Sequence, residues 1–373
     1  MSDRPPQGWM AEALALIHAS HHRTRPNPKV GCVIVRDGRI VGRGVSAPAG
    51  GPHAEVYALA EAGAAARGAD MYVTLEPCCH HGRTPPCTDA ILAAGVGRVF
   101  VGVRDPNPKV DGGGIAKLEA AGVPVAVGLM PPGHEHQHAP FARYILDGRP
   151  WVQLKAAVSL DGRIATAAGD SKWITGPAAR ADAHALRAAA DAVLVGSGTA
   201  RADDPALTVR LAPGSDPLRV VLDARGELPL DLQLMGPNTR LYHGPDVPAD
   251  RVRAWGDCGV TAVAAPLVGG RLDLPAVLAD LARTADIVRL MVEGGGRLHG
   301  ALLQAGLADE AVFYVAPRFI GEGRPVLALP SPPTVAQGWR LEGPTHTVLD
   351  ADVRIRGRIV YGAPPTAPAD GGH

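Results

Sequence analysis

The chain has 373 residues, of which 46% are hydrophobic and 20% charged, so it holds apolar material for more than one core and is not disordered throughout. Lys+Arg and Asp+Glu balance at 37 each, which argues against the basic surface that nucleic-acid binding favours. No apolar run approaches the ~18–20 residues that span a bilayer, and the N-terminus lacks the apolar segment of a signal peptide. We therefore expect a soluble, cytoplasmic protein without nucleic-acid or membrane partners.

The first part of the chain alternates short apolar strands with alanine- and leucine-rich helices, a pattern typical of α/β domains. In chain order, the pattern predicts a helix at 9–20, a strand at 30–35, its hairpin partner at 39–45, a helix at 54–62, a strand at 71–75, a helix at 88–94, a strand at 98–103, a helix at 113–121 and a strand at 125–127. The proline- and histidine-rich stretch 131–140 then indicates the approach to a domain boundary.

A second series of elements follows this stretch. It comprises strands at 151–158, 192–195, 218–222, 288–292 and 310–315, and helices at 178–190, 274–283 and 298–304. The two series predict two domains, 1–148 and 149–361. The last segment, 362–373, is rich in proline, alanine and glycine and is expected to be a disordered tail.

Three of the five cysteines, Cys78, Cys79 and Cys87, lie within ten residues. An odd number of cysteines in a chain of this kind favours a metal or redox site over a set of disulfides. His53 and Glu55 lie at the start of the helix predicted after the hairpin. One imidazole and two thiolates form a donor set that suits zinc, with a fourth position left open for water.

The second thiolate ligand is either Cys79 or Cys87. Cys78 is expected to start a helix, where the positive end of the dipole lowers the pKa of a thiol. Neighbouring residues of a helix point about 100° apart, so Cys78 and Cys79 can hardly face one ion, and we choose Cys87. Glu55 would face the same cavity and carry a proton from water to a departing amine. A closed structural zinc site, with His80 or His81 as fourth ligand, is the alternative.

The order His-x-Glu, then Pro-Cys, is that of zinc-dependent nucleobase deaminases, although no cysteine stands three residues after Cys78. Residues 74–87, TLEPCCHHGRTPPC, resemble the deaminase half of the bifunctional riboflavin-biosynthesis deaminase–reductases, which carry a similar insert between their two thiolates. The resemblance implies a cytidine-deaminase-like three-layer αβα domain. It also implies zinc ligands His53, Cys78 and Cys87, with Glu55 as the catalytic acid and base.

The pentapeptide Pro-Asn-Pro-Lys-Val occurs at 26–30 and again at 106–110. A residue before proline is held extended, so each asparagine either presents its amide rigidly or belongs to a structural turn, and both interpretations stay open. The resemblance implies that the substrate is contacted by Asn27, Asp105 and Asn107. The insert side chains that it places near the ribose phosphate, unless the insert is a plain surface loop, are His80, His81 and Arg83.

The second half contains no Gly-x-Gly-x-x-Gly motif, which disfavours a standard dinucleotide-binding domain. Glu293-Gly-Gly-Gly-Arg-Leu298 nevertheless follows a predicted strand and opens a helix. Freely accessible backbone N–H groups at a helix N-terminus form a cradle for an anion such as a pyrophosphate. A plain strand–helix turn is the alternative.

Residues 155–163, 171–175 and 196–210 resemble the reductase half of the same family, a dihydrofolate-reductase-like α/β domain. The NADPH contacts that this resemblance implies are Ala157, Ser171, Trp173, Thr199, Asp203, Gly295, Gly296 and Arg297. The substrate contacts that it implies are Arg187, Leu207, Arg210 and Glu293. The two arginines would share the substrate phosphate. Ala224 stands where the family often has a hydroxyl residue, so the preference for NADPH rests on the resemblance alone.

We therefore expect a bifunctional enzyme, a hydrolase and an oxidoreductase, that forms a homo-oligomer. Its zinc domain would deaminate diaminohydroxyphosphoribosylaminopyrimidine, and its NADPH-dependent domain would then reduce the ribosyl side chain to ribityl, with Lys155 or Asp161 as candidate proton relays. One alternative is a zinc deaminase of another nucleobase or of nucleic acid, with a non-catalytic second half. A zinc-stabilised binding protein is the other.

Overall fold

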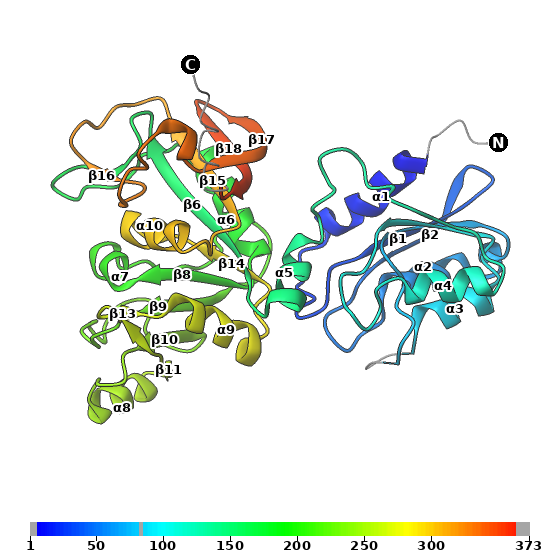
Figure 1. Ribbon diagram of the computed structural model, residues 1–373, viewed down its shortest axis with the longest axis horizontal. Helices are drawn as coiled ribbons and strands as arrows, with labels where there is room; N and C mark the ends of the chain where they lie inside the picture. The colour runs from blue at the N-terminus through cyan, green and yellow to red at the C-terminus, as the bar shows by residue number, and fades with distance from the viewer. Residues whose placement is uncertain (1–5, 82–84, 363–373) are drawn as a thin grey trace, which may run out of the picture. The chain divides into compact units, whose positions relative to one another are not determined.

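The computed structural model describes residues 6–81 and 85–362, and the chain divides between Arg149 and Pro150 into two compact units (Figure 1). The expectations for Arg83, and for the tail beyond Gly362, fall outside the described residues. Within the described ranges, no helix combines the length and apolar character that crossing a membrane requires.

The first unit is built on a five-stranded sheet in the order β2-β1-β3-β4-β5. Its strands are β1 Gly31–Arg36, β2 Arg39–Val45, β3 Asp70–Leu75, β4 Arg98–Val103 and β5 Val125–Val127. β1 is antiparallel to both of its neighbours, whereas β3, β4 and β5 are parallel. The ends of β2, β3 and β4 therefore meet at one edge of the sheet, beside the start of β1.

Helices cover both faces of this sheet. They are α1 Pro6–Ala19, α2 Ala54–Ala62, the short 3₁₀ helix η1 Gly63–Ala66, α3 Cys87–Ala94, α4 Gly113–Ala120 and α5 Ala139–Asp147. Alternate residues of β1 separate two cores: Cys32 and Ile34 pack with α2, α3 and α4, while Val33 and Val35 pack with α1. The three-layer αβα arrangement predicted for this half is confirmed.

The second unit contains a nine-stranded sheet in the order β11-β10-β9-β8-β14-β6-β15-β18-β17. Its strands are β6 Trp151–Ser159, β8 Ala192–Gly196, β9 Leu218–Leu222, β10 Thr239–His243, β11 Thr261–Ala264, β14 Arg289–Val292, β15 Glu310–Ala316, β17 Arg340–Leu349 and β18 Asp352–Val360. All neighbours are parallel except along the hairpin β17–β18, which completes one edge antiparallel to β15. Short pairs are β7 Arg163–Ala165 with β16 Arg324–Pro325 and β12 Leu267–Val268 with β13 Arg271–Leu272.

The helices of this unit are α6 Pro177–Ala189, α7 Ser197–Asp203, α8 Ala249–Asp257, α9 Leu274–Ala285 and α10 Gly296–Gln304, with a 3₁₀ turn η2 at Val335–Gln337. Side chains of β8 alternate between two cores: Ala192 and Leu194 pack with α9 and α10, while Val193 and Val195 pack with α7 and α8. A parallel sheet covered on both faces explains why strand β8, Ala-Val-Leu-Val-Gly, is apolar along its length. The predicted α/β character of the second half is confirmed.

One predicted helix start is wrong. Cys78 lies in an irregular loop, and α3 begins nine residues later at Cys87, because Pro85 and Pro86 hold the chain extended up to that point. Several elements were not predicted at all, among them α5, α7, α8, β10 and the β17–β18 hairpin. Most of the hairpin strand β17 is exposed and polar, so it lacks the apolar alternation by which a strand is recognised.

Candidate metal centre and second-unit pocket

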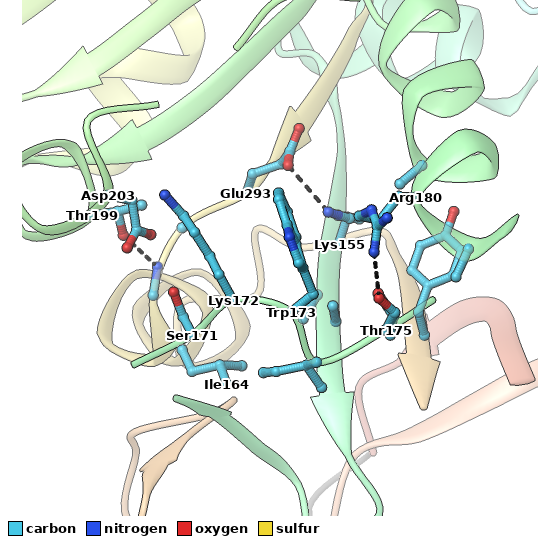
Figure 2. Close-up of a pocket in the computed structure, with 18 residues that line it drawn as sticks. Lys155, Ile164, Ser171, Lys172, Trp173, Thr175, Arg180, Thr199, Asp203 and Glu293 are labelled. Atoms are coloured by element: carbon cyan, nitrogen blue, oxygen red, sulfur yellow. Dashed lines mark hydrogen bonds and ion pairs between the residues drawn. The ribbon is translucent and has the colours of Figure 1, made fainter. Parts of the chain in front are cut away.

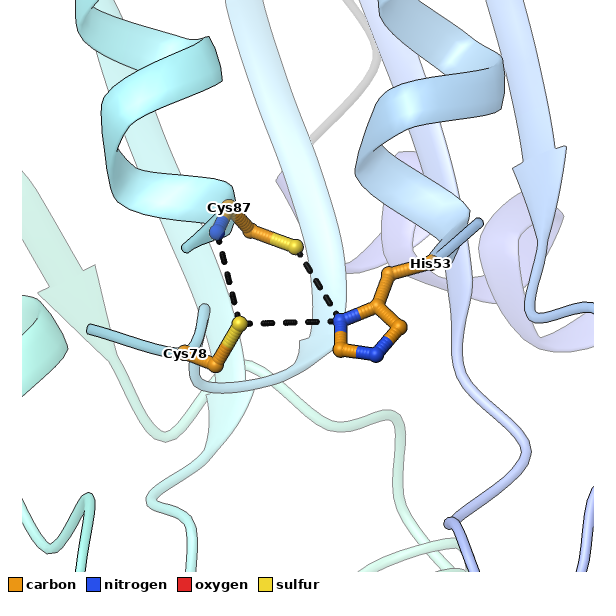
Figure 3. A group of neighbouring side chains, drawn as sticks. All are labelled: His53, Cys78 and Cys87. Atoms are coloured by element: carbon orange, nitrogen blue, oxygen red, sulfur yellow. Dashed lines mark hydrogen bonds between the residues drawn. The ribbon is translucent and has the colours of Figure 1, made fainter. Parts of the chain in front are cut away.

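The candidate metal ligands gather where the strand ends of the first unit meet. His53 follows β2 and immediately precedes α2, Cys78 follows β3, and Cys87 is the first residue of α3. His53 Nδ1 lies 3.2 Å from Cys87 Sγ and 3.6 Å from Cys78 Sγ (Figure 3). Among the described residues, this is the one group of three or more His, Cys, Asp or Glu side chains whose ligand atoms lie within 4.8 Å of one another.

These distances fit zinc. Tetrahedral zinc with Zn–N of about 2.0–2.1 Å and Zn–S of about 2.3 Å separates its nitrogen and sulfur ligands by roughly 3.6 Å. The set supplies one nitrogen and two sulfur atoms, which leaves one tetrahedral position for water or substrate. The residues present therefore match an open zinc site in both chemistry and spacing.

The helix-dipole argument applies to Cys87 and not to Cys78. Cys87 lies in the first turn of α3, where the N-terminal partial charge favours a thiolate. Its backbone N–H donates to Cys78 Sγ over 3.3 Å. Hydrogen bonds from Cys87 and His53 lower the pKa of the Cys78 thiol in spite of its partial burial. The hydrogen bond to Cys78 and burial raise the pKa of the Cys87 thiol, so the thiolate of the pair is Cys78, and a metal ion that binds both sulfurs would have to displace the Cys87 proton.

Cys79 is turned away from this group. Its Sγ lies only 3.0 Å from the position that a Cβ on Gly113 would occupy, so the sulfur packs against the first residue of α4. The structure brings Cys87 and Cys78 together, but the reason that we gave for excluding Cys79 was wrong. Cys79 is excluded by the path of a loop, because no helix starts at Cys78.

Glu55 lies in the first turn of α2 and is only 3% exposed. Burial raises the pKa of its carboxyl to about 7, and the neighbouring Cys78 sulfur adds to the rise. The carboxyl group also interacts with Cys87, which places it beside the ligand group. A carboxyl with a pKa near neutrality can both accept and release a proton at physiological pH.

The predicted substrate contacts of this unit occupy the same edge of the sheet. Asp105 follows β4 and is buried, which raises the pKa of its carboxyl to about 6, with further contributions from Glu76 and Cys78. Asn107 donates its backbone N–H to Asp105, and its side-chain oxygen accepts from the backbone of Lys109. The amide of Asn107 therefore takes part in a local turn, as the structural interpretation of the repeated pentapeptide expects.

Asn27 precedes β1, whose first residues lie beside the end of β3. The hydroxyl of Thr24 donates to the backbone carbonyl of Asn27, so this copy of the pentapeptide also begins with a fixed turn. The predicted contact residues Asn27 and Asp105 thus lie on the side of the sheet where the metal ligands gather, one before β1 and the other after β4.

The second unit has a cavity of about 260 Å³ beside β6, β14, α6 and α7 (Figure 2). Of the residues predicted for cofactor or substrate, those that line it are Ala157, Ser171, Trp173, Thr199, Asp203, Glu293 and Gly295. Gly296 and Arg297 do not line it and instead form the first turn of α10. The hydroxyl of Thr199 accepts the backbone N–H of Gly295 over 3.1 Å, which ties α7 to the glycine turn.

Trp173 forms one wall of this cavity, although its side chain is 62% exposed. The Arg180 guanidinium lies 4.6 Å from the centre of the indole ring and donates to the carbonyl of Thr175. Arg318 donates to the carbonyl of Trp173 over 3.0 Å. Two arginines thus hold an exposed aromatic ring in place, which suits stacking against a flat heterocycle.

Three charged side chains form a buried cluster at the same cavity. Glu293 accepts hydrogen bonds from Lys155 at 3.2 Å and from two nitrogens of Arg187 at 2.7 and 3.0 Å. Burial alone would raise the pKa of Glu293, but Lys155 and Arg187 lower it to about 2. The remaining Arg187 terminal nitrogen donates to the Thr208 carbonyl, so each of the three guanidinium nitrogens has a partner within the protein.

The other predicted substrate residues, Arg210 and Leu207, differ from Arg187 in their exposure and in the groups that they contact. Arg210 is exposed, and its guanidinium donates to the hydroxyl of Thr208. Leu207 is 4% exposed, with its side chain in the core and a φ of +53°. A leucine in this region of φ is strained, and such positions often occur at functional sites.

Sequence reasoning missed four polar or aromatic residues that also line the cavity, namely Lys172, Thr175, Arg180 and Tyr314. Lys172 and Thr175 lie inside the segment 171–175 that carried the resemblance, so a full reading of that segment would have found them. Tyr314 lies on β15, and nothing in its local sequence distinguishes it from a core residue.

Comparisons with known proteins agree with this geometry. The profile of the cytidine and deoxycytidylate deaminase zinc-binding region matches residues 4–103, and that of the RibD C-terminal domain matches residues 150–353. The riboflavin biosynthesis protein RibD of Escherichia coli strain K12 is 44% identical over 337 residues, covering 86% of this chain and 90% of the relative. RibD of Bacillus amyloliquefaciens is also 44% identical, covering 84% and 85%.

Solved structures give the same result. RibD of Acinetobacter baumannii, in its form 1, superposes with a TM-score of 0.82 at 39% identity, covering 95% of this chain and 99% of the other. The diaminohydroxyphosphoribosylaminopyrimidine deaminase/5-amino-6-(5-phosphoribosylamino)uracil reductase of Thermotoga maritima superposes with a TM-score of 0.82 at 34% identity, covering 95% and 98%. The chain belongs to the RibD family, the bifunctional zinc-dependent deaminases and reductases of riboflavin biosynthesis.

Proposed function

We propose that the first unit deaminates diaminohydroxyphosphoribosylaminopyrimidine at the centre formed by His53, Cys78 and Cys87. The second unit then reduces the ribosyl group of the product to ribityl, with NADPH bound in the cavity beside Trp173. The observation that carries the first assignment is the buried Glu55 beside an open set of one imidazole and two sulfur ligands. A closed structural site would give this costly buried carboxyl no purpose.

Hydrolytic deamination adds water to the amine-bearing ring carbon and releases ammonia. Zinc held by His53, Cys78 and Cys87 supplies the Lewis acidity that makes water nucleophilic near neutral pH. Glu55 accepts the proton that the water loses and returns it to the departing amine, a role that suits a carboxyl with a pKa of about 7. Asp105, buried close to Cys78, is positioned to bind a ring or amine hydrogen of the pyrimidine.

Two features of the second unit suit the binding of NADPH, namely the start of α10 and the wall of the cavity formed by Trp173. A Cβ on Gly296 would lie 2.2 Å from the carbonyl of Pro325, so only glycine lets α10 start at this point. The N-terminus of α10 offers backbone N–H groups for a pyrophosphate, and Trp173 offers a flat wall for a ring. NADPH supplies the hydride, and the protein's part is to bind and orient the two reactants.

Lys155 is the better of the two candidate proton relays. It lines the cavity and donates to Glu293, so its ammonium group is held at the site. Asp161 instead accepts from Ser159, from Ile320 and from the backbone of Gly321, which ties two loops together and lowers the pKa of its carboxyl to about 2. We assign proton transfer to Lys155 and a structural role to Asp161.

We assign the substrate phosphate of the second reaction to Arg210 in preference to Arg187. Arg210 is exposed and its guanidinium donates to the hydroxyl of Thr208, whereas Arg187 is buried and paired with Glu293. Cytoplasmic location and self-association are further proposals. Thiolate zinc ligands call for a reducing compartment, which the cytoplasm provides.

The two halves are tested together by a reciprocal pair of variants. Glu55→Gln should retain zinc but release ammonia from the diaminopyrimidine at least ~100-fold more slowly, while oxidising NADPH normally with pre-deaminated substrate. Trp173→Ala should do the opposite, weakening NADPH binding roughly 5- to 150-fold through the lost stacking while deaminating normally. Full deamination by Glu55→Gln, or unchanged NADPH binding by Trp173→Ala, would remove that residue from its assigned role.

A further inference from the structure

Glu76, the residue that follows β3, carries a carboxylate with four backbone partners. It is only 3% exposed. One oxygen, Oε1, accepts the N–H groups of Gly114 at 2.9 Å and Ile115 at 3.1 Å. The other, Oε2, accepts those of Gly112 at 3.1 Å and Asp105 at 3.2 Å. Each oxygen therefore accepts two backbone N–H groups, and Glu76 is not one of the three residues of the metal group.

The four partners belong to two separate parts of the chain. Gly112, Gly114 and Ile115 form the N-terminus of α4, whereas Asp105 lies in the loop after β4. Glu76 thus joins the end of β3 to the end of β4 and to α4 through a single side chain. A carboxylate at a helix N-terminus also gains from the helix dipole, which strengthens this connection.

Close packing of Pro77, the residue after Glu76, against α4 reinforces these hydrogen bonds. A Cβ on Gly114 would lie 2.0 Å from the carbonyl oxygen of Pro77, so α4 touches the backbone of the loop between Glu76 and Cys78. Cys79 Sγ packs on Gly113 in the same way. Residues on both sides of Cys78 are therefore held against α4, which leaves Cys78 little freedom to move.

We propose that Glu76 is a positioning residue of the deaminase centre, which sets the place of the ligand Cys78 and of Asp105 by binding both of their loops to α4. The inference rests on the proposed metal role of His53, Cys78 and Cys87. Glu76 touches neither the metal nor the substrate; it acts through the backbone on either side of the residues that do. Residues that orient metal ligands in this way typically change metal affinity or activity by ~10- to 100-fold when they are replaced.

Glu76→Gln is the direct test, because glutamine keeps the size of the side chain but replaces one acceptor oxygen by an NH₂ group. In either orientation that group faces two N–H donors, so two of the four hydrogen bonds are lost. We expect zinc affinity, measured by competition with a chelator, to fall ~10- to 100-fold. In the protein loaded with Co²⁺ in place of zinc, the thiolate-to-metal absorption bands should shift, because Cys78 changes its geometry at the metal.

Two further variants make the result specific. Glu119→Gln alters an exposed glutamate on the same helix, α4, and should leave metal affinity and the Co²⁺ spectrum as in the wild type. Glu76→Asp keeps both acceptor oxygens on a shorter side chain and should recover part of the affinity and of the spectrum. Reduction by the second unit should be unchanged in all three variants.

A merely structural Glu76 gives a different pattern. If Glu76→Gln unfolds at a lower denaturant concentration but binds metal with wild-type affinity and an unshifted Co²⁺ spectrum, the proposal is overturned. If Glu76→Gln does not fold, a Glu76→Asp variant that unfolds at a lower denaturant concentration yet keeps wild-type affinity and spectrum overturns it equally. Failure of the wild-type chain itself to bind zinc or Co²⁺ through its thiolates would instead refute the proposed metal centre.

Discussion

The metal group brings together single residues from three places in the first unit, the start of α2, the start of α3 and the loop after β3. His53 is held by the start of α2, Cys87 by the start of α3, and Cys78 by a loop whose neighbours are attached to α4. Each ligand therefore has its own support, and the three ligand atoms come together without any sequence-adjacent pair. Cys79, the neighbour of Cys78 in the sequence, shows the consequence. Its sulfur packs against α4 and does not belong to the metal group.

At this scale we predict that Cys87→Ser loses stoichiometric zinc while Cys79→Ser keeps it. Serine is a poor zinc ligand compared with a thiolate, and Cys87 Sγ is 3.2 Å from His53 Nδ1 whereas Cys79 lies outside the ligand group. Metal analysis of both purified variants provides the measurement. Zinc retained by Cys87→Ser and lost from Cys79→Ser would reverse the assignment of the second thiolate.

Among the elements, helix α2 carries Glu55 and lies directly on the backbone of β2. A Cβ on Gly42 would lie 2.1 Å from the carbonyl of Ala58, and one on Gly44 would lie 1.9 Å from that of Ala54. Neither glycine is needed for an unusual φ, so both are required by the close approach of helix and strand. This contact sets the distance between α2 and the sheet. It therefore also sets the positions of His53 and Glu55.

We predict that Gly44→Ala destabilises the first unit by about 1–3 kcal/mol, because the new methyl group pushes α2 away from β2. Deamination should fall more than stability alone explains, since Glu55 moves with the helix. Urea unfolding of the full chain, together with ammonia release under conditions where the variant is folded, measures both effects. Gly256→Ala, where no atom lies within 4 Å of the new Cβ, should change neither, and equal behaviour of the two variants would contradict the packing argument.

The whole molecule combines two units with separate chemistry, and their responses to acid are expected to differ. In the second unit, His299 is fully buried and its Nε2 interacts with the carbonyl of Val292. Burial lowers the pKa of His299 from 6.5 to about 4, with Lys155 acting in the same direction and Glu293 against it. Burial and the charges of Arg187 and Arg210 likewise lower the pKa of His184 to about 4.

We predict that the free energy of unfolding of the second unit falls as the pH is lowered from about 6.5 to 4. In this window the unfolded chain binds protons at these histidines that the folded chain does not, so acid favours unfolding. For His299, a pKa lowered from 6.5 to about 4 corresponds to roughly 3 kcal/mol. Urea titrations at several pH values measure the slope, and His299→Gln should flatten it; an unchanged slope in that variant would show that His299 does not contribute.

The sequence determined the parts of this protein that depend on local chemistry. The donor set of one imidazole and two thiolates, the helix that carries Glu55, and the segment 171–175 of the second cavity can all be recognised from residue type and spacing. Periodicity likewise predicts the buried strands, because strands covered on both faces must be apolar along their length. The roles of the individual site residues beyond these geometric facts stay predictions until the variants are measured.

The tertiary structure decided what depends on residues far apart in the chain. Glu76 reaches α4 across 36 to 39 residues, and Glu293 binds Arg187 across 106 residues and Lys155 across 138. No local pattern marks such pairs, because a buried carboxylate is tolerated only where the fold brings donors to it. For the same reason, only the folded chain shows that Arg187 is engaged within the protein while Arg210 is exposed.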